Sequence, residues 1–598
     1  MIKEDRQVNK GNFRIMTVDL SSGKASIEKI ADQDKAVGGS GLCALLFEKA
    51  GLKDEPWNHP EQPLIFAIGP LTGYFPLMSK TVCAFKSPYH NQYTESHGGG
   101  RSALSLRFTG LDALVIKGRA KRPCLLSIGS NSLEIKDAHF LWGMDVIYSG
   151  RIIRHMVEKS HGHRSILRIG PAGENLSAMA CINADTYRHF GRLGAGAVMG
   201  AKNLKAIVIL GDSSLPMPQE NKPYRKMWKE VFQDVHSSGM MHKYHDLGTP
   251  ANLERLNNIK SLPWRNLQAS YDPDAHMISG QSFATRHLLR NLACSGCPVG
   301  CIHVGFVREK FTKDSRYYYQ QMAYDYEPIF ALGSMLGIKE PVTILKLIEK
   351  ADRLGLDAIS AGVALAWATE AMEKAIITQK ETLLPLSFGH GASYLEALGH
   401  LAVASNEFYR LLAQGTLKAA NRYGGGEFAC VLGQEMAGYA TGELFFAAQS
   451  LGFRHSHLDT GAYSYEQKHA EQDLKKAVDF LLEDELPRCL LNSMVACLFS
   501  RKVYTKERLA QCLESLGYLD LAANLDKAAA DIRRARWKLR FDTGFDPDEI
   551  EIPKRFFKVT SWKGPVDRKF LLELKRSYGQ AIKNLVFKQA NPPQGTRK

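Results

Sequence analysis

The sequence predicts an α+β protein in which a β-rich N-terminal domain precedes two mainly α-helical domains. Short β-favouring runs separated by glycine turns fill roughly the first 210 residues. A proline-rich segment at 215–218 (LPMP) follows, and beyond it apolar residues recur at helical spacing. A chain of 598 residues is long enough for two to four domains. We therefore place the domains at residues 1–212, 213–420 and 421–598.

The strands of the first domain are predicted from runs of apolar and β-branched residues that end at Gly or Ser-Gly turns. The runs lie at 13–20, 64–68, 113–116, 124–128 and 206–210. In the second domain, apolar residues at three-to-four spacing predict helices over 344–354 and 361–376. The third domain keeps this helical pattern, interrupted by glycine-rich turns such as 424–426.

Composition and charge exclude several classes of protein. With 44% hydrophobic and 23% charged residues, the chain reads as an ordinary globular protein. Its 77 Lys and Arg against 62 Asp and Glu suggest an anionic partner or substrate. No zinc-finger, RNP or GXXG signature accompanies this charge, so we expect no nucleic-acid partner. No run of about 18 apolar residues predicts a membrane span. Eleven Cys without a secretory signal predict reduced thiols and a cytoplasmic protein.

A cluster of cysteines gives the strongest local signal. Cys294, Cys297 and Cys301 are spaced so that their thiols can converge on one metal centre. Pro298, directly after a cysteine, is typical of iron–sulfur ligands. Three thiols need a fourth ligand from elsewhere in the chain. Structural zinc is the alternative, although zinc sites more often comprise two separated pairs.

Five glycine-rich loops in the first domain suggest a large ligand that carries phosphate. Backbone N–H groups beside glycine can approach a phosphate closely, and Arg or Lys adds positive charge. Neither a Walker A sequence nor a Rossmann fingerprint is present, and each loop taken alone is more often a simple turn. The loops are at 38–41, 69–73, 97–101, 170–175 and 191–196.

These segments, taken in order, resemble the tungsten-dependent aldehyde:ferredoxin oxidoreductase family. The resemblance covers residues 11–20, 69–73, 108–118 and 169–175, and continues to about Phe557. Its most specific stretch is residues 191–206 (GRLGAGAVMGAKNLKA). The cysteine cluster follows at the expected place.

The resemblance implies a β-rich N-terminal domain that binds a tungsten bis-pyranopterin, with molybdenum as the alternative metal. It also implies a [4Fe–4S] cluster on Cys294, Cys297, Cys301 and Cys497, with Cys489 as the competing fourth ligand. Mg²⁺ would bridge the pterin phosphates. The electron acceptor would be ferredoxin or a partner subunit. Some members of the family form homodimers, which makes a homodimer an expectation here too.

The resemblance further assigns the residues that contact the cofactor. The motif Asp352-x-x-Gly355-Leu356-Asp357 is intact, although these residues could also be a helix C-terminus capped by Gly355. A second motif, at 492–497, departs from the family because Asn492 replaces Asp and a Val replaces Gly. Lys80 stands where the family has Arg, and His97 stands where it has Asn. The remaining expected contacts are Gly98, Gly99, Arg192, Gly194 and Glu435.

Two residues fall on the family's active-site Glu and His, namely Glu327 and His457, with His455 as the fallback. Without the resemblance, Glu327 could simply begin a helix, and His457 could be a surface imidazole. The implied reaction oxidises a small aldehyde to its carboxylic acid with water as the oxygen source. We expect His457 to polarise the carbonyl, and Glu327 to act as a general base with a raised pKa.

Two further functions remain open at this stage. One is tungsten-dependent reduction of an aromatic thioester or carboxylate, because the second pterin motif is altered. The other is an electron-transfer subunit that keeps the cluster but has lost tungsten. The intact Asp352 and Asp357 argue against the second.

Overall fold

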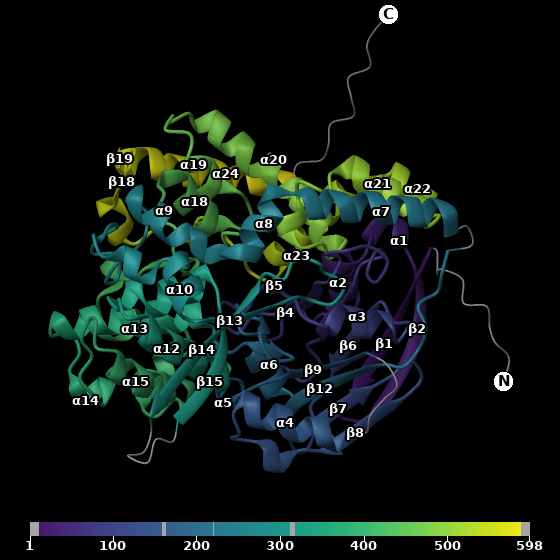
Figure 1. Cartoon of the computed structure of the whole chain (residues 1–598), viewed down its shortest axis with the longest axis horizontal. Helices are drawn as coiled ribbons and strands as arrows, with labels where there is room; N and C mark the ends of the chain where they lie inside the picture. The colour runs from purple at the N-terminus through teal and green to yellow at the C-terminus, as the bar shows by residue number, and fades with distance from the viewer. Residues whose placement is uncertain (1–10, 158–162, 219–220, 311–316, 588–598) are drawn as a thin grey trace, which may run out of the picture.

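The computed structural model describes residues 11–157, 163–218, 221–310 and 317–587. Figure 1 shows the β-rich N-terminal region in purple and blue at the lower right, and a teal and green helical region at the left. The C-terminal helices lie along the top of the same view. This arrangement confirms the predicted α+β class, while the three domain boundaries stay predictions.

Two six-stranded sheets form the N-terminal region. The first has the order β2-β1-β6-β3-β4-β5, and the second has the order β11-β10-β9-β12-β7-β8. The pairs β1–β6 and β7–β12 are parallel. The strands are β1 Asn12–Asp19, β2 Lys24–Ala31, β3 Leu64–Ala67, β4 Thr81–Lys86, β5 Tyr93–Gly98, β6 Ala113–Lys117, β7 Cys124–Ile128, β8 Leu133–Asp137, β9 His163–Arg168, β10 Ile182–Ala184, β11 Arg188–Phe190 and β12 Leu204–Gly211. All five predicted strands are present.

Apart from its exposed edge strand β2, the first sheet is buried on both faces. On β1, Met16 and Val18 point into a core shared with the second sheet. Phe13 and Ile15, one position out of phase, belong to a second core that includes many of the helices. This separation follows from the two-residue period of a strand. The first sheet therefore lies between the second sheet and the helical part of the chain.

The remaining elements are mostly helices. Those of the N-terminal region are α1 Gln33–Ala36, α2 Gly39–Ala50, α3 Ser102–Arg107, α4 Val146–Met156, α5 Pro171–Glu174 and α6 Ala195–Ala201. Later helices are α7 Asn221–Ser237, α8 Gly239–Asp246, α9 Asn252–Asn258, α10 Gly280–Arg286, α11 Tyr326–Leu332, α12 Pro341–Leu354, α13 Ala358–Glu373, α14 Gln379–Thr382, α15 Gly391–Val403, α16 Glu407–Leu412, α17 Thr416–Tyr423, α18 Glu443–Leu451, α19 Ala462–Glu466, α20 Leu474–Ser493, α21 Lys506–Ser515, α22 Leu519–Ala523, α23 Leu525–Asp542 and α24 Arg568–Phe587. Short strands pair β16 Val431–Leu432 with β17 Gln434–Glu435, and β18 Thr560–Ser561 with β19 Gly564–Pro565.

The two helices predicted in the second domain are confirmed as α12 and α13. Helix α12 begins where the Glu340 side chain accepts from the N–H groups of Val342 and Thr343. It ends at Gly355, whose φ of 72° lies in the left-handed region. Among the described residues no single helix is long and apolar enough to cross a membrane. Only α11 with the 3₁₀ turn after it, joined to α12 across a 115° bend, reaches that length and hydropathy.

A three-stranded sheet interrupts the region that the sequence predicted as helical. Its strands are β13 Leu288–Leu292, β14 Ile302–Lys310 and β15 Tyr317–Tyr324, in the order β13-β14-β15. The loop from β13 to β14 contains the three clustered cysteines. The sheet therefore fixes both ends of the cysteine loop.

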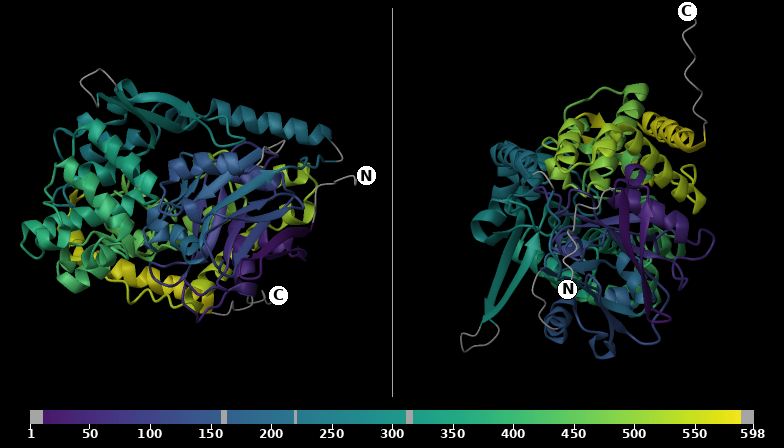
Figure 2. Two further views of the ribbon diagram at one scale, coloured as in Figure 1. Left: turned by 90° about the horizontal axis from the view of Figure 1, so that it is seen from below. Right: turned by 90° about the vertical axis from the view of Figure 1, so that its right-hand side faces the viewer.

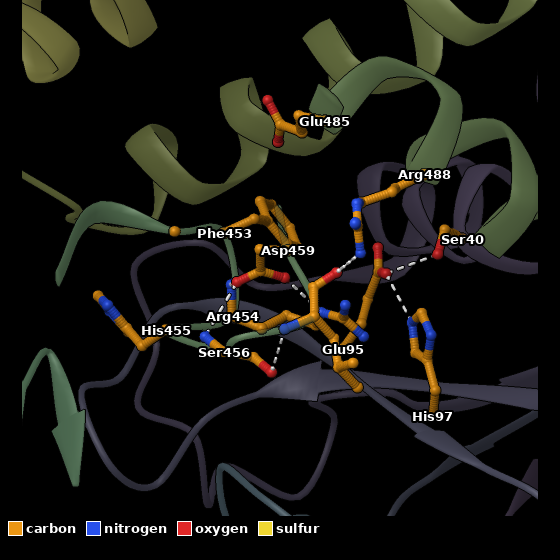
Figure 3. Close-up of polar contacts among 12 residues, drawn as sticks. Ser40, Glu95, His97, Phe453, Arg454, His455, Ser456, Asp459, Glu485 and Arg488 are labelled. Carbon is orange, nitrogen blue, oxygen red and sulfur yellow. Dashed lines mark hydrogen bonds and ion pairs between the residues drawn. The ribbon is translucent and has the colours of Figure 1, made fainter. Parts of the chain in front are cut away.

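A buried ion pair joins the N-terminal sheet to a C-terminal helix. Glu95 on β5 accepts from Arg536 on α23 through two hydrogen bonds, of 2.7 and 3.0 Å, across 441 positions of sequence. The same carboxylate accepts from Ser40 at 2.6 Å and from His97 at 3.2 Å, as Figure 3 shows. Burial raises the pKa of Glu95, but Arg536 and His97 outweigh burial and hold the pKa well below its ordinary value.

We expect Arg536→Met to lower the free energy of unfolding by about 3–5 kcal/mol, because the buried Glu95 carboxylate would lose its partner. Urea unfolding followed by tryptophan fluorescence measures the effect. The double variant Glu95→Gln/Arg536→Met should recover part of the loss. As a control, Lys506→Met breaks an exposed pair with Asp526 and should leave the transition midpoint unchanged. An unchanged midpoint in Arg536→Met would contradict the structural role of the pair.

Candidate functional site

One cavity brings together most of the site residues predicted from the sequence. Its volume is about 380 Å³, which is within the range of small-molecule sites. Its walls come from both ends of the chain, from residue 77 to residue 499. The predicted residues that line it are Lys80, His97, Arg192, Cys294, Cys297, Cys301, Glu327, Asp352, Leu356, Asp357, His457, Asn492 and Cys497.

The other predicted contacts, four glycines and Glu435, lie behind this lining. A Cβ on Gly99 would lie 2.9 Å from the Cys294 sulfur, and one on Gly98 would lie 2.8 Å from the Phe190 ring. Gly194, with φ +86°, begins α6, and a Cβ there would lie 2.2 Å from Pro88. Close packing therefore accounts for these three glycines in the ligand-free chain.

Segments far apart in sequence position the four predicted cluster cysteines. The Leu77 N–H donates to the Gly296 carbonyl at 3.2 Å, and the Leu77 carbonyl accepts from the Cys497 N–H at 2.9 Å. Leu77 has φ 61°, which a non-glycine residue rarely adopts, so these contacts hold a strained backbone. The competing ligand Cys489 lies elsewhere, with its sulfur 3.1 Å from the Arg536 guanidinium.

Burial and positive charge set the chemistry of the cysteine site. Burial raises the pKa of Cys297 and of Cys301 to about 12, so each thiol must lose a proton on binding a metal. Burial lowers the pKa of Lys80, but Cys497 and Cys294 outweigh it and leave the pKa above its ordinary value. Among the described residues no group of three or more His, Cys, Asp or Glu side chains is arranged to hold a single metal ion.

Arg188, which the sequence analysis did not identify, also faces the cysteines. Burial lowers its pKa, but Asp325, with Cys294 and Cys301, raises it, and the net pKa is above the ordinary value. Its Nη1 lies 3.2 Å from the Asp325 carboxylate. A cation fixed beside thiols stabilises their deprotonated, metal-binding form.

The motif from Asp352 to Asp357 connects α12 to α13 and also stabilises this connection. Asp357 accepts from the Ile359 N–H at 3.1 Å as the N-cap of α13, and pairs with the Arg192 Nε at 3.3 Å. The Asp352 carboxylate lies 3.2 Å from the His189 Nε2, without hydrogen-bond geometry. The helix-capping reading and the cofactor reading of this motif are therefore compatible.

Glu435 positions Arg192 rather than facing the cavity. One of its carboxylate oxygens accepts from the Tyr89 hydroxyl at 2.7 Å and from the Thr416 hydroxyl at 2.7 Å. Its backbone carbonyl accepts from the Arg192 Nη2 at 2.7 Å.

Several buried donors that belong to the cavity lining have no partner among the described residues. They include Nε of Arg188, Nη1 of Arg192 and Nη2 of Arg454. A buried donor without a partner costs about 1–3 kcal/mol. Several of them around one cavity indicate a ligand with many acceptor oxygens, such as one with phosphates.

Glu327 and His457 form a direct pair. The His457 Nε2 lies 3.0 Å from Glu327 Oε1, and the Tyr439 hydroxyl donates to the same oxygen at 2.7 Å. Burial raises the pKa of Glu327, but the hydrogen bonds and charge of His457 and the Tyr439 bond outweigh burial and lower it. The expected raised pKa is therefore wrong in direction, because burial was considered without these partners.

His455, the fallback for His457, lies away from the cavity. Its Nδ1 is 3.2 Å from the Gln449 carbonyl, and its Nε2 contacts Arg540. Burial, with the charge of Arg540, holds its pKa well below the ordinary value. A neutral, fully bonded imidazole of this kind serves packing.

Three site residues were missed by sequence reasoning. Arg454 was visible as part of a basic run, and its guanidinium is held by Asp459 at 2.7 Å, as Figure 3 shows. Arg188 lies in a short basic run with His189, which spacing alone does not distinguish from a solvated turn. Tyr439 gave no signal, because its role depends on a contact across 112 positions of sequence.

We expect His457→Asn to raise the pKa of Glu327, since the main contributions that lower it are lost while burial remains. In the wild type the carboxylate should stay ionised on acidification to below the ordinary 4.5; in the variant it should protonate at higher pH. Infrared difference spectra of the carboxylic acid band measure this, with Glu327→Gln identifying the band. Tyr439→Phe should shift the pKa in the same direction by less. A lower pKa in His457→Asn would contradict the pairing.

Comparison with known proteins gives the family of the chain. Residues 15–211 match the family model of the aldehyde ferredoxin oxidoreductase N-terminal domain, and residues 226–582 match that of domains 2 and 3. A tungsten-containing aldehyde ferredoxin oxidoreductase of Pyrococcus furiosus is 31% identical over 578 residues, 93% of each chain. One of Thermococcus kodakarensis is 30% identical over 580 residues, again 93% of each chain.

Other similar proteins have different names. The WOR-like subunit of an aliphatic sulfonate oxidoreductase of Pyrococcus furiosus is 33% identical over 430 residues, 68% of this chain and 67% of that protein. The solved active-site complex BamBC of benzoyl coenzyme A reductase shares the fold, with a TM-score of 0.78 at 20% identity over 96% of this chain and 95% of that one. The two family models together span most of the chain and confirm the resemblance found in the sequence. This protein therefore belongs to the aldehyde ferredoxin oxidoreductase family of oxidoreductases.

Proposed function

We propose that the protein oxidises a small aldehyde to its carboxylic acid at a tungsten bis-pyranopterin centre. Electrons leave through a [4Fe–4S] cluster to ferredoxin or a partner subunit. The observation that supports this best is the Glu327–His457 pair, which lines the same cavity as the four cysteines. A proton-handling pair beside a set of metal-binding thiols suits a reaction that releases protons and electrons together.

The donors of the cavity fit a cofactor rich in oxygen acceptors. Arg188, Arg192 and Arg454 would donate their free N–H groups to its phosphates and rings. Asp352 and Asp357 would accept from pterin N–H groups. When bound, the metal–pterin group would supply a two-electron acceptor for the substrate, and the cluster would supply a one-electron path out of the site. Molybdenum in place of tungsten would leave these protein contacts unchanged.

Mg²⁺ would belong to the phosphate end of this cofactor, near Lys80 and His97. Burial, with the charge of Arg454, lowers the pKa of His97 to about 4, although Glu95 acts in the opposite sense. His97 is therefore neutral at physiological pH and adds no charge that would repel a cation. Lys80 supplies the positive charge that phosphates require.

The hydrogen bonds of His457 decide what its free nitrogen can do. Nε2 donates to the Glu327 carboxylate, so in a neutral imidazole the free Nδ1 can only accept a hydrogen bond. Only the imidazolium can donate from Nδ1 to an aldehyde oxygen. Glu327, paired with the opposite nitrogen of the ring, would hold the His457 imidazole in the orientation that polarises the carbonyl.

One carboxylate oxygen of Glu327 would act as the general base toward the attacking water or the gem-diol of the substrate. Its Oε1 accepts from His457 and Tyr439, and Oε2 would serve as the base. A carboxylate with a lowered pKa is a weaker base than the sequence analysis assumed. The proton that Glu327 takes up would be released to water, since the Nε2 of His457 that faces it already carries a proton.

The cysteine arrangement is compatible with a four-iron cluster. Four thiolates on one zinc ion would lie about 3.8 Å apart, given Zn–S distances of about 2.3 Å in a tetrahedron. No described group of three or more such side chains is arranged to hold a single ion. A four-iron cluster does not need that arrangement, since each cysteine binds a different iron.

Metal analysis of protein purified without oxygen tests the proposal. We expect about one tungsten and about four iron per chain, and reduction of benzyl viologen with at least one member of an aldehyde panel. Iron without tungsten or molybdenum would instead favour a cluster-only electron-transfer subunit. Zinc alone would contradict the cluster.

Two cysteine variants give a matched control for the same analysis. Cys497→Ser should lower the iron content, because it removes a cavity-lining ligand. Cys489→Ser should keep the iron, because its thiol lies on Arg536 instead.

We expect Glu327→Gln to lower kcat by at least about 10²-fold, the scale of lost general-base catalysis, with tungsten and iron retained. Steady-state kinetics with viologen, together with metal content, measures both. Tyr439→Phe, which removes one donor to the carboxylate, should cost less. Near-normal turnover in Glu327→Gln would remove this residue from the mechanism.

A further inference from the structure

One end of the catalytic cavity reaches the protein surface beside the proposed catalytic pair. Leu458 follows His457 in the chain, lines the cavity and is 36% exposed. Leu498 and Phe499 lie in the 3₁₀ turn Leu498–Ser500 and line the cavity too. We call these three apolar residues the cavity mouth. A molecule that enters at this end would meet apolar side chains before it meets the catalytic pair.

Two aromatic pairs continue the wall of the cavity mouth. Tyr244, on α8, stacks on Phe499 with ring centroids 3.7 Å apart and planes 12° apart. Tyr463, on α19, has its ring centroid 4.2 Å from that of Tyr439 and 6.1 Å from that of His457. Helix α8 therefore borders the C-terminal part of the chain, and in the right view of Figure 2 teal helices lie beside light-green ones. The mouth thus combines aromatic rings from α8, from α19 and from its own 3₁₀ turn.

The two outer tyrosines are close enough to the catalytic carboxylate for its charge to act on both. Burial, with smaller contributions from Tyr244 and Glu327, raises the pKa of Tyr463 to about 12. Burial raises the pKa of Tyr244 as well, with a smaller contribution from Glu327, although the charge and the hydrogen bond of Arg501 act in the opposite sense. Both phenols therefore lie near Glu327 on one side and near Arg501 on the other.

Arg501 brings an unpaired positive charge to the mouth. Its Nη1 donates to the Leu498 carbonyl at 2.9 Å, and its side chain is partly buried. Within the described ranges of the chain no carboxylate forms an ion pair with it. Glu327, the acid whose charge reaches the same tyrosines, is already bonded to His457 and Tyr439. A guanidinium that is partly desolvated and lacks a counter-charge is typical of an anion-binding site.

A second guanidinium at the mouth is already neutralised. Arg488 pairs through Nε with Asp484 at 2.6 Å, and its Nη1 donates to the Leu458 carbonyl at 3.2 Å. Burial raises the pKa of Tyr463, and the charges of Arg501 and Arg488 both act in the opposite sense, so the two cations lie near the same ring. Because Asp484 compensates Arg488, Arg501 is the cation that remains for a ligand.

We propose that Arg501 binds the carboxylate of an aromatic aldehyde, and that the cavity mouth holds the ring between that carboxylate and the reacting group. This inference rests on the proposed function, and it names the substrate class of the same site. A guanidinium matches a carboxylate with two parallel hydrogen bonds, and a flat ring packs favourably against aromatic walls. The formyl group then reaches His457 and Glu327 at the inner end of the mouth. Oxidation of one such aldehyde with one water gives an aromatic dicarboxylate, three protons and two electrons, and the electrons leave by the route already proposed.

The test compares kcat/KM for para-formylbenzoate and for its neutral methyl ester, with the holoprotein and benzyl viologen. The wild type should favour the carboxylate by at least about tenfold, the scale of hydrogen bonds to a charged group. Arg501→Met should abolish that preference, mainly by raising KM for the carboxylate. Arg501→Lys should recover part of it, because an ammonium keeps the charge but loses the bidentate geometry.

The matched control is Lys502→Met, which removes the same charge from the exposed residue next in sequence and should keep the preference. Isothermal titration calorimetry with terephthalate, the product of this reaction, gives a second readout that needs no turnover. Terephthalate binding should weaken by at least about tenfold in Arg501→Met and stay at the wild-type value in Lys502→Met.

The outcomes separate this inference from the proposed function. An equal preference in Arg501→Met and the wild type would overturn the carboxylate site and leave the proposed function standing, since aldehydes would still be oxidised. A wild type that favours the aliphatic succinic semialdehyde over para-formylbenzoate would overturn the aromatic substrate class. A metal-loaded wild type that oxidises no aldehyde would remove the proposed function, and this inference with it.

Discussion

Two oppositely charged side chains, Glu95 on β5 and Arg536 on α23, meet in the interior where the N-terminal sheet touches a C-terminal helix. Neither charge could stay buried alone, because desolvation costs several kcal/mol for each ion. Their pairing therefore requires the two ends of the chain to close on each other. Glu95 itself lines the cavity as a charged carboxylate, and its neighbour His97 is neutral because burial and the charge of Arg454 lower its pKa to about 4. The shape and the charge of the site both depend on this contact.

The cavity contrasts with that closed pair, because it keeps donors without partners. Arg192 and Arg454 are each held by a carboxylate on one side and have an unpartnered N–H on the other. Each unpartnered group destabilises the folded chain by about 1–3 kcal/mol. In return, the donors are already in position when a ligand binds. Binding of such a ligand stabilises the folded state by mass action, since the unfolded chain cannot present the same array.

Local sequence patterns predicted the elements that depend on local physics. Strand alternation located β1, and the apolar period with Gly355 as a cap located α12 and its end. The spacing of Cys294, Cys297 and Cys301 predicted a metal-binding loop, and the structure brings these residues to one cavity with Cys497. The sheet around that loop was missed, because its strands, such as the one that begins at Tyr317, lie in a region where apolar residues recur at helical spacing. The pKa of Glu327 could not be foreseen, because its direction depends on Tyr439 and His457, which only the folded chain brings near.

The separation of 441 positions between Glu95 and Arg536 also sets an order of events during synthesis. At about 5–20 residues per second, the second partner emerges about 20–90 s after the first. During that interval Arg536 is not yet available to pair with Glu95. The cysteine loop likewise lacks Cys497, its proposed fourth partner. The cavity cannot close around a cofactor until nearly the whole chain has been made. The cavity therefore stays incomplete during most of the synthesis of the chain, and it closes only when the C-terminal segments have been made.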